Sequence, residues 1–344
     1  MDVVRRQRAA ALVVAGALLL VAVLVATSKG VTPLPASGIV ATLLDRAGIG
    51  IGTPLQGIDA NVLLSIRLPR VLLVALVGGV LALAGASYQG VFRNPLADPY
   101  LLGAAAGAGL GATLVIAFVP QGVGPFGTLP VAAFAGALAG VALAYSLGTA
   151  AGRGQAGSAT LLLAGVAVSS FLTAMQTLVQ QAHTDNLRQV YGWILGQLGT
   201  ADWSQIVMVL PYMAVSTVVM LASARALDVL AVGDDEATTL GVRPRRVRFA
   251  VLVAASLGTA AAVAVSGLIG FVGLVVPHIV RRLAGGSYRT VLPVSLLGGA
   301  AFLVLADLLA RTVIAPGELP IGVVTAFVGA PFFAALLRVG GGSS

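Results

Sequence analysis

The sequence contains no cysteine, one lysine (Lys29) and two histidines, His183 and His278. Without cysteine there are no disulfides and no thiolate metal ligands. The two histidines lie far apart in the sequence, so we expect no metal site. The pattern G-x-x-x-x-G-K-[ST] does not occur around Lys29, which excludes ATP hydrolysis by a P-loop of this chain. No acid–base or nucleophilic constellation is evident, so we expect no catalytic residue and no cofactor in this chain.

Charge is also scarce. Only 9% of the 344 residues are charged and 58% are hydrophobic, with a mean hydropathy of +1.01. A soluble domain keeps roughly a quarter of its residues charged, so this composition predicts a membrane protein. Basic residues outnumber acidic ones by 20 to 12. The arginines form short clusters between apolar runs, which favours a role in membrane orientation, and we expect no nucleic-acid partner.

Runs of about 20 apolar residues cross the roughly 30 Å hydrocarbon core of a bilayer. The sequence predicts about ten such helices and therefore an all-α polytopic membrane protein. The expected spans lie near residues 9–27, 69–91, 100–119, 128–150, 159–182, 204–224, 249–268, 271–284, 291–313 and 320–338. No compositional break divides the chain, so we expect a single transmembrane domain over residues 1–344.

An even number of spans places both termini on one side. A cytoplasmic N-terminus puts most of the 20 Lys and Arg residues inside, as the positive-inside rule requires. The arginines at positions 5, 6 and 8 also fit a signal peptide, but the apolar run after them is long and lacks an A-x-A site, which favours an anchor. In this topology segment 28–68 lies outside, and the polar, basic segment 226–248 lies in the cytoplasm.

Four segments carry polar signals. Arg67-Leu68-Pro69-Arg70 precedes the second span, where the arginines project from one face or snorkel to the interface. Residues 89–103 contain Asn-Pro and Asp-Pro, which predict a tight cytoplasmic turn. Residues 234–242 predict a short helix that Asp234 caps and Gly241 ends, either a docking element or an ordinary re-entry loop. In the C-terminal stretch, Asp307 and Arg311 share one helix face.

Glycines recur at small-xxx-small spacing, which indicates close helix packing. They are Gly103, Gly107 and Gly111 in the third span and Gly136 and Gly140 in the fourth.

In their order these segments resemble the permease family of type II ABC importers for ferric siderophores, haem and cobalamin. The resemblance covers residues 60–338 and rests on R-L-P-R (67–70), N-P-L-A-D-P (94–99), G-F-V-G-L-V-V-P-H (270–278) and E-L-P-I-G-V-V-T (318–325). It implies a homodimer of this chain in the inner membrane, two ATP-binding subunits that hold ATP and Mg²⁺, and an external substrate-binding protein.

The resemblance also implies roles for individual residues. Arg67, Arg70 and Arg311 match arginines that grip acidic residues of the binding protein. Segment 234–242 matches a coupling helix on the ATPase, with contacts expected from Asp234, Asp235, Glu236, Ala237, Leu240 and Gly241. The fifth span lines the path, where we expect Met175, Gln176, Val179, Gln180 and His183. Ser158, Ala159 and Thr184 match gate positions.

Several alternatives stay open at this point. Gln176 and Gln180 fit helix–helix hydrogen bonding as well as a path. A proton- or sodium-coupled transporter predicts more buried carboxylates than Asp307, and an intramembrane enzyme predicts a catalytic constellation. We expect import of an iron chelate, a ferric siderophore or haem, with cobalamin as the second candidate.

Overall fold

The computed structural model describes residues 2–30, 32–119, 127–152, 158–196, 198–199 and 201–340, which form helices and connecting segments without any strand. Each predicted span coincides with a helix: α1 (Asp2–Ser28), α4 (Leu68–Phe92), α5 (Ala104–Phe118), α6 (Thr128–Ala151), α7 (Ser158–Ala182), α9 (Trp203–Ala222), α12 (Pro244–Ser266), α13 (Val272–Ala284), α14 (Tyr288–Thr312) and α15 (Ile321–Gly340). Seven of the described helices are long and apolar enough to cross a membrane by themselves. Helices α5, α13 and the described apolar part of α15 are shorter.

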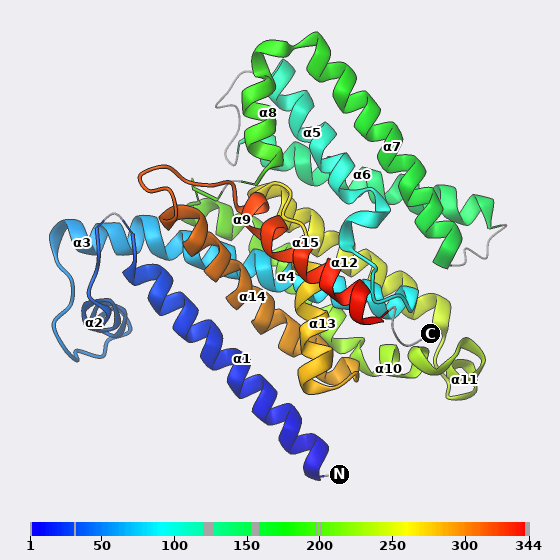
Figure 1. The fold of residues 1–344 in the computed structure, drawn as a ribbon, viewed down its shortest axis with the longest axis horizontal. Coiled ribbons are helices and arrows are strands. Elements are labelled where there is room, and N and C mark those ends of the chain that lie inside the picture. The colour runs from blue at the N-terminus through cyan, green and yellow to red at the C-terminus, as the bar shows by residue number, and fades with distance from the viewer. Residues whose placement is uncertain are drawn as a thin grey trace.

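Short elements occupy the connections. They are α2 (Ala36–Arg46), α3 (Gly57–Asn61), the π-helical turn η1 (Val62–Arg67), the 3-10 turns η2 (Pro99–Leu102) and η3 (Thr184–Asn186), α8 (Leu187–Ile194), α10 (Ala224–Val232) and α11 (Asp234–Thr239). Helices α2 and α3 lie at one end of the molecule, and α10 and α11 lie at the other. Helix α1 begins and α15 ends on the side of α10 and α11 (Figure 1).

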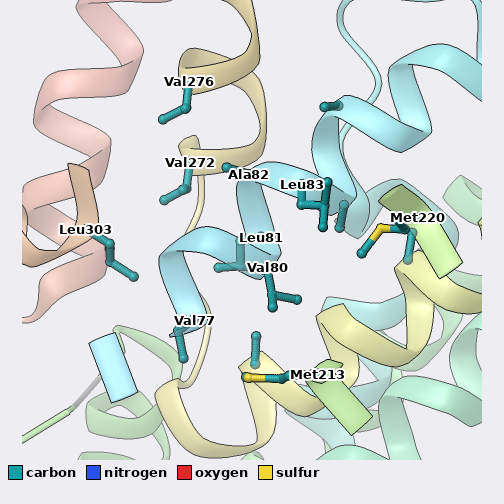
Figure 2. Close-up of a cluster of buried hydrophobic side chains, with 14 of the residues drawn as sticks. Val77, Val80, Leu81, Ala82, Leu83, Met213, Met220, Val272, Val276 and Leu303 are labelled. Atoms are coloured by element: carbon teal, nitrogen blue, oxygen red, sulfur yellow. The ribbon is translucent and has the colours of Figure 1, made fainter. Parts of the chain in front are cut away.

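Helix α4 is the centre of the fold. It packs against α9, α12, α13 and α14. In its most apolar stretch 83% of the residues are buried, as expected for a helix that is hydrophobic on every side. Figure 2 shows Val77, Val80 and Leu81 of α4 beside Met213 of α9, Val272 and Val276 of α13, and Leu303 of α14. This surrounding core holds α4 in place, and Arg70 near its first turn is positioned with it.

Glycines set the closest helix contacts. The predicted glycine spacing in the third and fourth spans is confirmed as helix packing, because Gly103, Gly107 and Gly111 face Gly140, Gly136 and Ala132 across the α5–α6 contact. A methyl group at Gly107 would collide with the Gly136 carbonyl oxygen, and one at Gly136 would collide with that of Gly107. Such small residues let helices approach closely in lipid, where no hydrophobic effect drives them together.

Candidate functional site

A cluster of charged side chains joins α4, α14 and the segment before α15, at the end of the molecule where α3 and η1 lead into α4. The Arg70 guanidinium donates from Nε and Nη2 to Asp307 Oδ1 at 3.1 and 2.8 Å. It also donates from Nη1 and Nη2 to the two carboxylate oxygens of Glu318 at 2.8 and 2.9 Å. The side chains of Arg70 and Asp307 are 12% and 2% exposed, whereas that of Glu318 is 45% exposed. The cluster therefore has a buried pair and one accessible carboxylate.

The other two arginines bind the C-terminal end of α1. Arg67 donates from Nη1 to the Thr27 carbonyl at 2.7 Å and to that of Ser28 at 3.1 Å. Arg311 donates to the carbonyls of Lys29, at 3.1 Å, and of Ala26. The last carbonyls of a helix lack intrahelical donors and carry partial negative charge, so both guanidiniums complement this end of α1. The predicted proximity of Arg311 to Asp307 is observed, with Nε 3.4 Å from Oδ2.

The structure corrects the expectation that Arg67 and Arg70 project from one face of a helix. Arg67 is turned toward α1 and Arg70 toward α14, and neither projects from the surface. Arg67 is 6% exposed and the Arg311 side chain 9%. A cavity of ≈ 230 Å³ lies over the cluster, lined by Arg70, Gly196, Leu198, Gly199, Asp307, Ala310, Glu318, Leu319, Pro320 and Ile321.

The start of α15 is bound to the connection that follows α8. The backbone N–H of Ile321 donates to the Gly196 carbonyl at 3.3 Å, and that of Gly322 to the Leu195 carbonyl at 3.0 Å. These two N–H groups belong to the first turn of α15, where no intrahelical acceptor exists. A methyl group at Gly322 would lie 2.6 Å from the Leu195 oxygen, so glycine is needed for this approach.

A non-helical segment separates α12 from α13. The Tyr100 hydroxyl of η2 accepts a hydrogen bond from the N–H of Ile269 and donates one to the Ile269 carbonyl, both at 3.1 Å. Irregular backbone at membrane depth persists only where protein groups or water satisfy it. Tyr100 supplies those partners, so residues near the predicted turn at 94–99 hold the segment 267–271 in place.

The predicted path residues lie along the second half of α7 and directly after its end. Met175 is exposed, and Val179, Gln180 and His183 are half-buried. Gln176 differs, because it is 8% exposed and its amide lies against Gly109 of α5. The His183 ring contacts the Phe118 ring edge-on, with centroids 4.6 Å apart. Gln176 is thus packed against α5, and its path role and the hydrogen-bonding alternative both stay predictions, as do the path roles of the other residues.

The predicted gates lie at the two ends of α7. Ser158 and Ala159 begin the helix, with Ala159 exposed, and the Ser158 side chain is outside the described residues. Thr184 is exposed and begins η3, which leads into α8. Helix α8 thus connects Thr184, the predicted outer gate residue, at one end to the segment that binds α15 at the other.

The segment 226–248, which we expect in the cytoplasm, contains most of α10, all of α11 and the start of α12. Helix α11 ends as predicted, with Gly241 at φ +79°, a conformation that glycine adopts without strain. The predicted cap is wrong: Gly233 occupies the N-cap, and the Asp234 carboxylate binds Arg248 Nη1 and Nη2 at 2.7 Å each and also Arg93. The Arg248 hydrogen bond holds the pKa of Asp234 below its usual value.

Because Asp234 is paired in this way, a different set of side chains forms the surface of α11. Asp235, Glu236 and Leu240 are exposed, and Ala237 is buried beneath them. Arg93 also donates to the Leu230 carbonyl at 2.8 Å, so the turn after α4 is bound to both α10 and α11. Sequence reasoning missed Glu318, Arg93 and Arg248 because their partners lie on other helices. Of these three, Glu318 alone belongs to a motif that the sequence had singled out, E-L-P-I-G-V-V-T at 318–325.

Comparisons with known proteins give one consistent result. The chain is 42% identical to an uncharacterized ABC transporter permease protein, YvrB of Bacillus subtilis, over 97% of this chain and 94% of that protein. It is 45% identical to the cobalamin import system permease protein BtuC of Halobacterium salinarum, over 80% and 72%, and 42% identical to the hemin transport system permease protein HmuU of Yersinia pestis, over 79% and 82%.

The fold agrees with these sequences. A solved structure of an inward-facing, metal-chelate type ABC transporter superposes with a TM-score of 0.82 at 28% identity, covering 95% of this chain and 98% of the other. The sequence matches the FecCD transport family over residues 18–339. The protein is therefore an all-α, multi-pass membrane permease, and it belongs to the FecCD transport family.

Proposed function

We propose that this chain is the transmembrane subunit of an ATP-driven importer that moves an iron chelate, a ferric siderophore or haem, into the cytoplasm. A cobalamin importer is the alternative within the same family. The family match over residues 18–339 carries the proposal. An ion-coupled transporter is less favoured, because Asp307, its main candidate for a buried carboxylate, is already paired with Arg70 at 2.8 Å.

A separate subunit supplies ATP hydrolysis in this proposal. The chain has no P-loop, so ATP and Mg²⁺ bind two partner ATPase subunits. Helix α11 is the element that contacts them. Asp235, Glu236 and Leu240 form its exposed surface, and Asp234 ties that surface to Arg93 and Arg248 of the permease. Movement of the ATPase would thus pass into α4 and α12.

The arrangement at the opposite end supports docking of a substrate-binding protein. Arg70 and Arg311 lie at the outer end of the fold, where they neutralise Asp307 and complement α1. Arg67 contributes by fixing the end of α1 rather than by reaching outward. If α11 is cytoplasmic, the start of α1 and the end of α15 are cytoplasmic too, because both lie on the side of α10 and α11 (Figure 1).

The permease acts as a homodimer with a path between the two copies. Exposed apolar side chains on α7 and α15, such as Phe171, Leu178 and Phe327, supply a surface for the second copy or for lipid. Met175, Val179, Gln180 and His183 face the path near its outer end. In alternating access, closure of the ATPases shifts α11, and α7 and α8 open the path inward. No covalent chemistry occurs in the permease.

ATPase activity of the reconstituted complex tests this function. The assembled complex in nanodiscs is mixed with binding protein loaded in turn with haem, a ferric siderophore or cobalamin. Stimulation of hydrolysis by one loaded form confirms the importer and identifies its cargo. An assembled complex whose hydrolysis responds to no loaded binding protein contradicts the proposal.

A further inference from the structure

Glu318 binds the Nη1–Nη2 edge of the Arg70 guanidinium and is itself accessible. All three nitrogens of Arg70 are engaged: Nε by Asp307, Nη1 by Glu318 and Nη2 by both. Asp307 is almost fully buried on α14, whereas Glu318 lies in the segment between α14 and α15 and is 45% exposed. A carboxylate that arrives from outside and binds Nη1 and Nη2 of Arg70 together therefore replaces Glu318.

The replacement is energetically close to balanced. One carboxylate that binds two nitrogens of Arg70 is exchanged for another, and an accessible ion pair contributes little to stability because water competes for both charges. The cavity of ≈ 230 Å³ over the cluster supplies the room, and its lining includes Arg70, Asp307 and Glu318. Gly199 leaves space beside Glu318, since a methyl group there would lie 3.4 Å from Oε2.

Movement of Glu318 would be passed on by the residues that directly follow it to the end of α8, and so toward Thr184. The next residue, Leu319, donates its N–H to the Ala310 carbonyl at 2.8 Å, and Ile321 and Gly322 donate theirs to Gly196 and Leu195. The residues whose hydrogen bonds join α15 to the end of α8 thus follow Glu318 by only three and four positions. Helix α8 leads back to Thr184, the expected outer gate position.

We propose that Glu318 is a positioning residue that occupies, in the undocked permease, the site on Arg70 which a carboxylate of the external binding protein takes on docking. Its release loosens the first turn of α15 from the α8–α9 connection. Asp307 keeps Arg70 in position. While the binding protein is absent, the ion pair of Glu318 with Arg70 keeps the first turn of α15 bound to the α8–α9 connection. The inference rests on the proposed function, because it requires the binding protein.

The variant Glu318→Gln tests the exchange. It keeps the shape of the side chain and removes the charge that competes for Arg70. We expect the complex in nanodiscs to bind the stimulating binding protein about two- to fivefold more tightly, the range in which exposed ion pairs contribute. Hydrolysis without binding protein should also rise. Glu318→Asp keeps the charge and should behave as the wild type. Asp45→Asn, which removes an exposed carboxylate of α2, is the matched control and should change neither quantity.

Hydrogen exchange gives a second measurement. The amides of Leu319 and of residues 321–325 should exchange faster in the wild-type complex after the binding protein docks, and in Glu318→Gln without it. Weaker or unchanged binding of Glu318→Gln, or exchange at 319–325 that docking slows or leaves unchanged, overturns the inference.

The two proposals fail in different ways. If the binding protein does not stimulate the wild-type complex, the proposed function itself is wrong. If it stimulates the wild type while Glu318→Gln behaves like Asp45→Asn, only the role of Glu318 is wrong.

Discussion

Arg70 and Asp307 join the first turn of α4 to the last part of α14 through a nearly buried ion pair of 2.8 Å. Removing one partner leaves a charge without compensation in a poorly solvated site, which typically costs roughly 3–5 kcal/mol. Since Glu318 still binds Arg70, we expect Asp307→Asn to destabilise the permease by about 3 kcal/mol, the lower end of that range. Thermal unfolding in detergent measures the loss.

A double variant separates stability from docking. Arg70→Met with Asp307→Leu replaces the buried pair by apolar side chains. Glu318 is then left to water, and Arg311 keeps its hydrogen bonds to the Ala26 and Lys29 carbonyls, so the double variant should be more stable than Asp307→Asn. The same protein should no longer be stimulated by the binding protein. Retained stimulation would show that Arg70 takes no part in docking.

The sequence predicted the helices well because each membrane span is a local feature of composition. Apolar runs mark α1, α4 and α14 directly, and the spacing of the glycines in α5 and α6 indicates a close helix–helix contact. The partner of Arg70 was not predictable in this way, since Glu318 lies 248 positions away and shares no periodic pattern with it. Asp234 was assigned to a cap for the same reason: its arginine partners lie on other elements.

Tyr100 is expected to hold the break between α12 and α13. Tyr100→Phe removes the hydroxyl that bonds Ile269, which leaves backbone groups unsatisfied and should lower stability by about 1–3 kcal/mol. Tyr191→Phe is the control, because that tyrosine is exposed on α8. The melting temperatures of the two variants are compared, and equal values would remove Tyr100 from this role.

Close packing around α4 gives a steric prediction. A methyl group at Gly85 would collide with the Gly273 carbonyl of α13, so Gly85→Ala should reduce the yield of folded permease and lower its melting temperature. Gly16→Ala is the control, since nothing lies near that position on α1. Size-exclusion chromatography and thermal unfolding report both effects, and similar behaviour of the two variants would contradict the α4–α13 contact.

The pairing of Asp234 with Arg248 predicts a pH dependence of stability at the end of the molecule that carries α11. Because Arg248 lowers the pKa of Asp234 in the folded protein, its contribution is present above the unfolded pKa of roughly 4 and is lost as pH falls through the lower folded pKa. Asp234→Asn should therefore be less stable than the wild type at neutral pH, and the difference should shrink in acid. The same substitution should weaken coupling to the ATPase. A difference that grows in acid would contradict the pairing.

Uptake of chelate into proteoliposomes tests the central claim most directly. Vesicles carry the permease and its ATPase subunits, binding protein loaded with haem, a ferric siderophore or cobalamin is added outside, and accumulation is followed with and without ATP in the lumen. The account predicts accumulation that needs lumenal ATP and persists when an ionophore removes ion gradients. Uptake that survives without ATP but collapses with the ionophore would contradict it and establish an ion-coupled transporter.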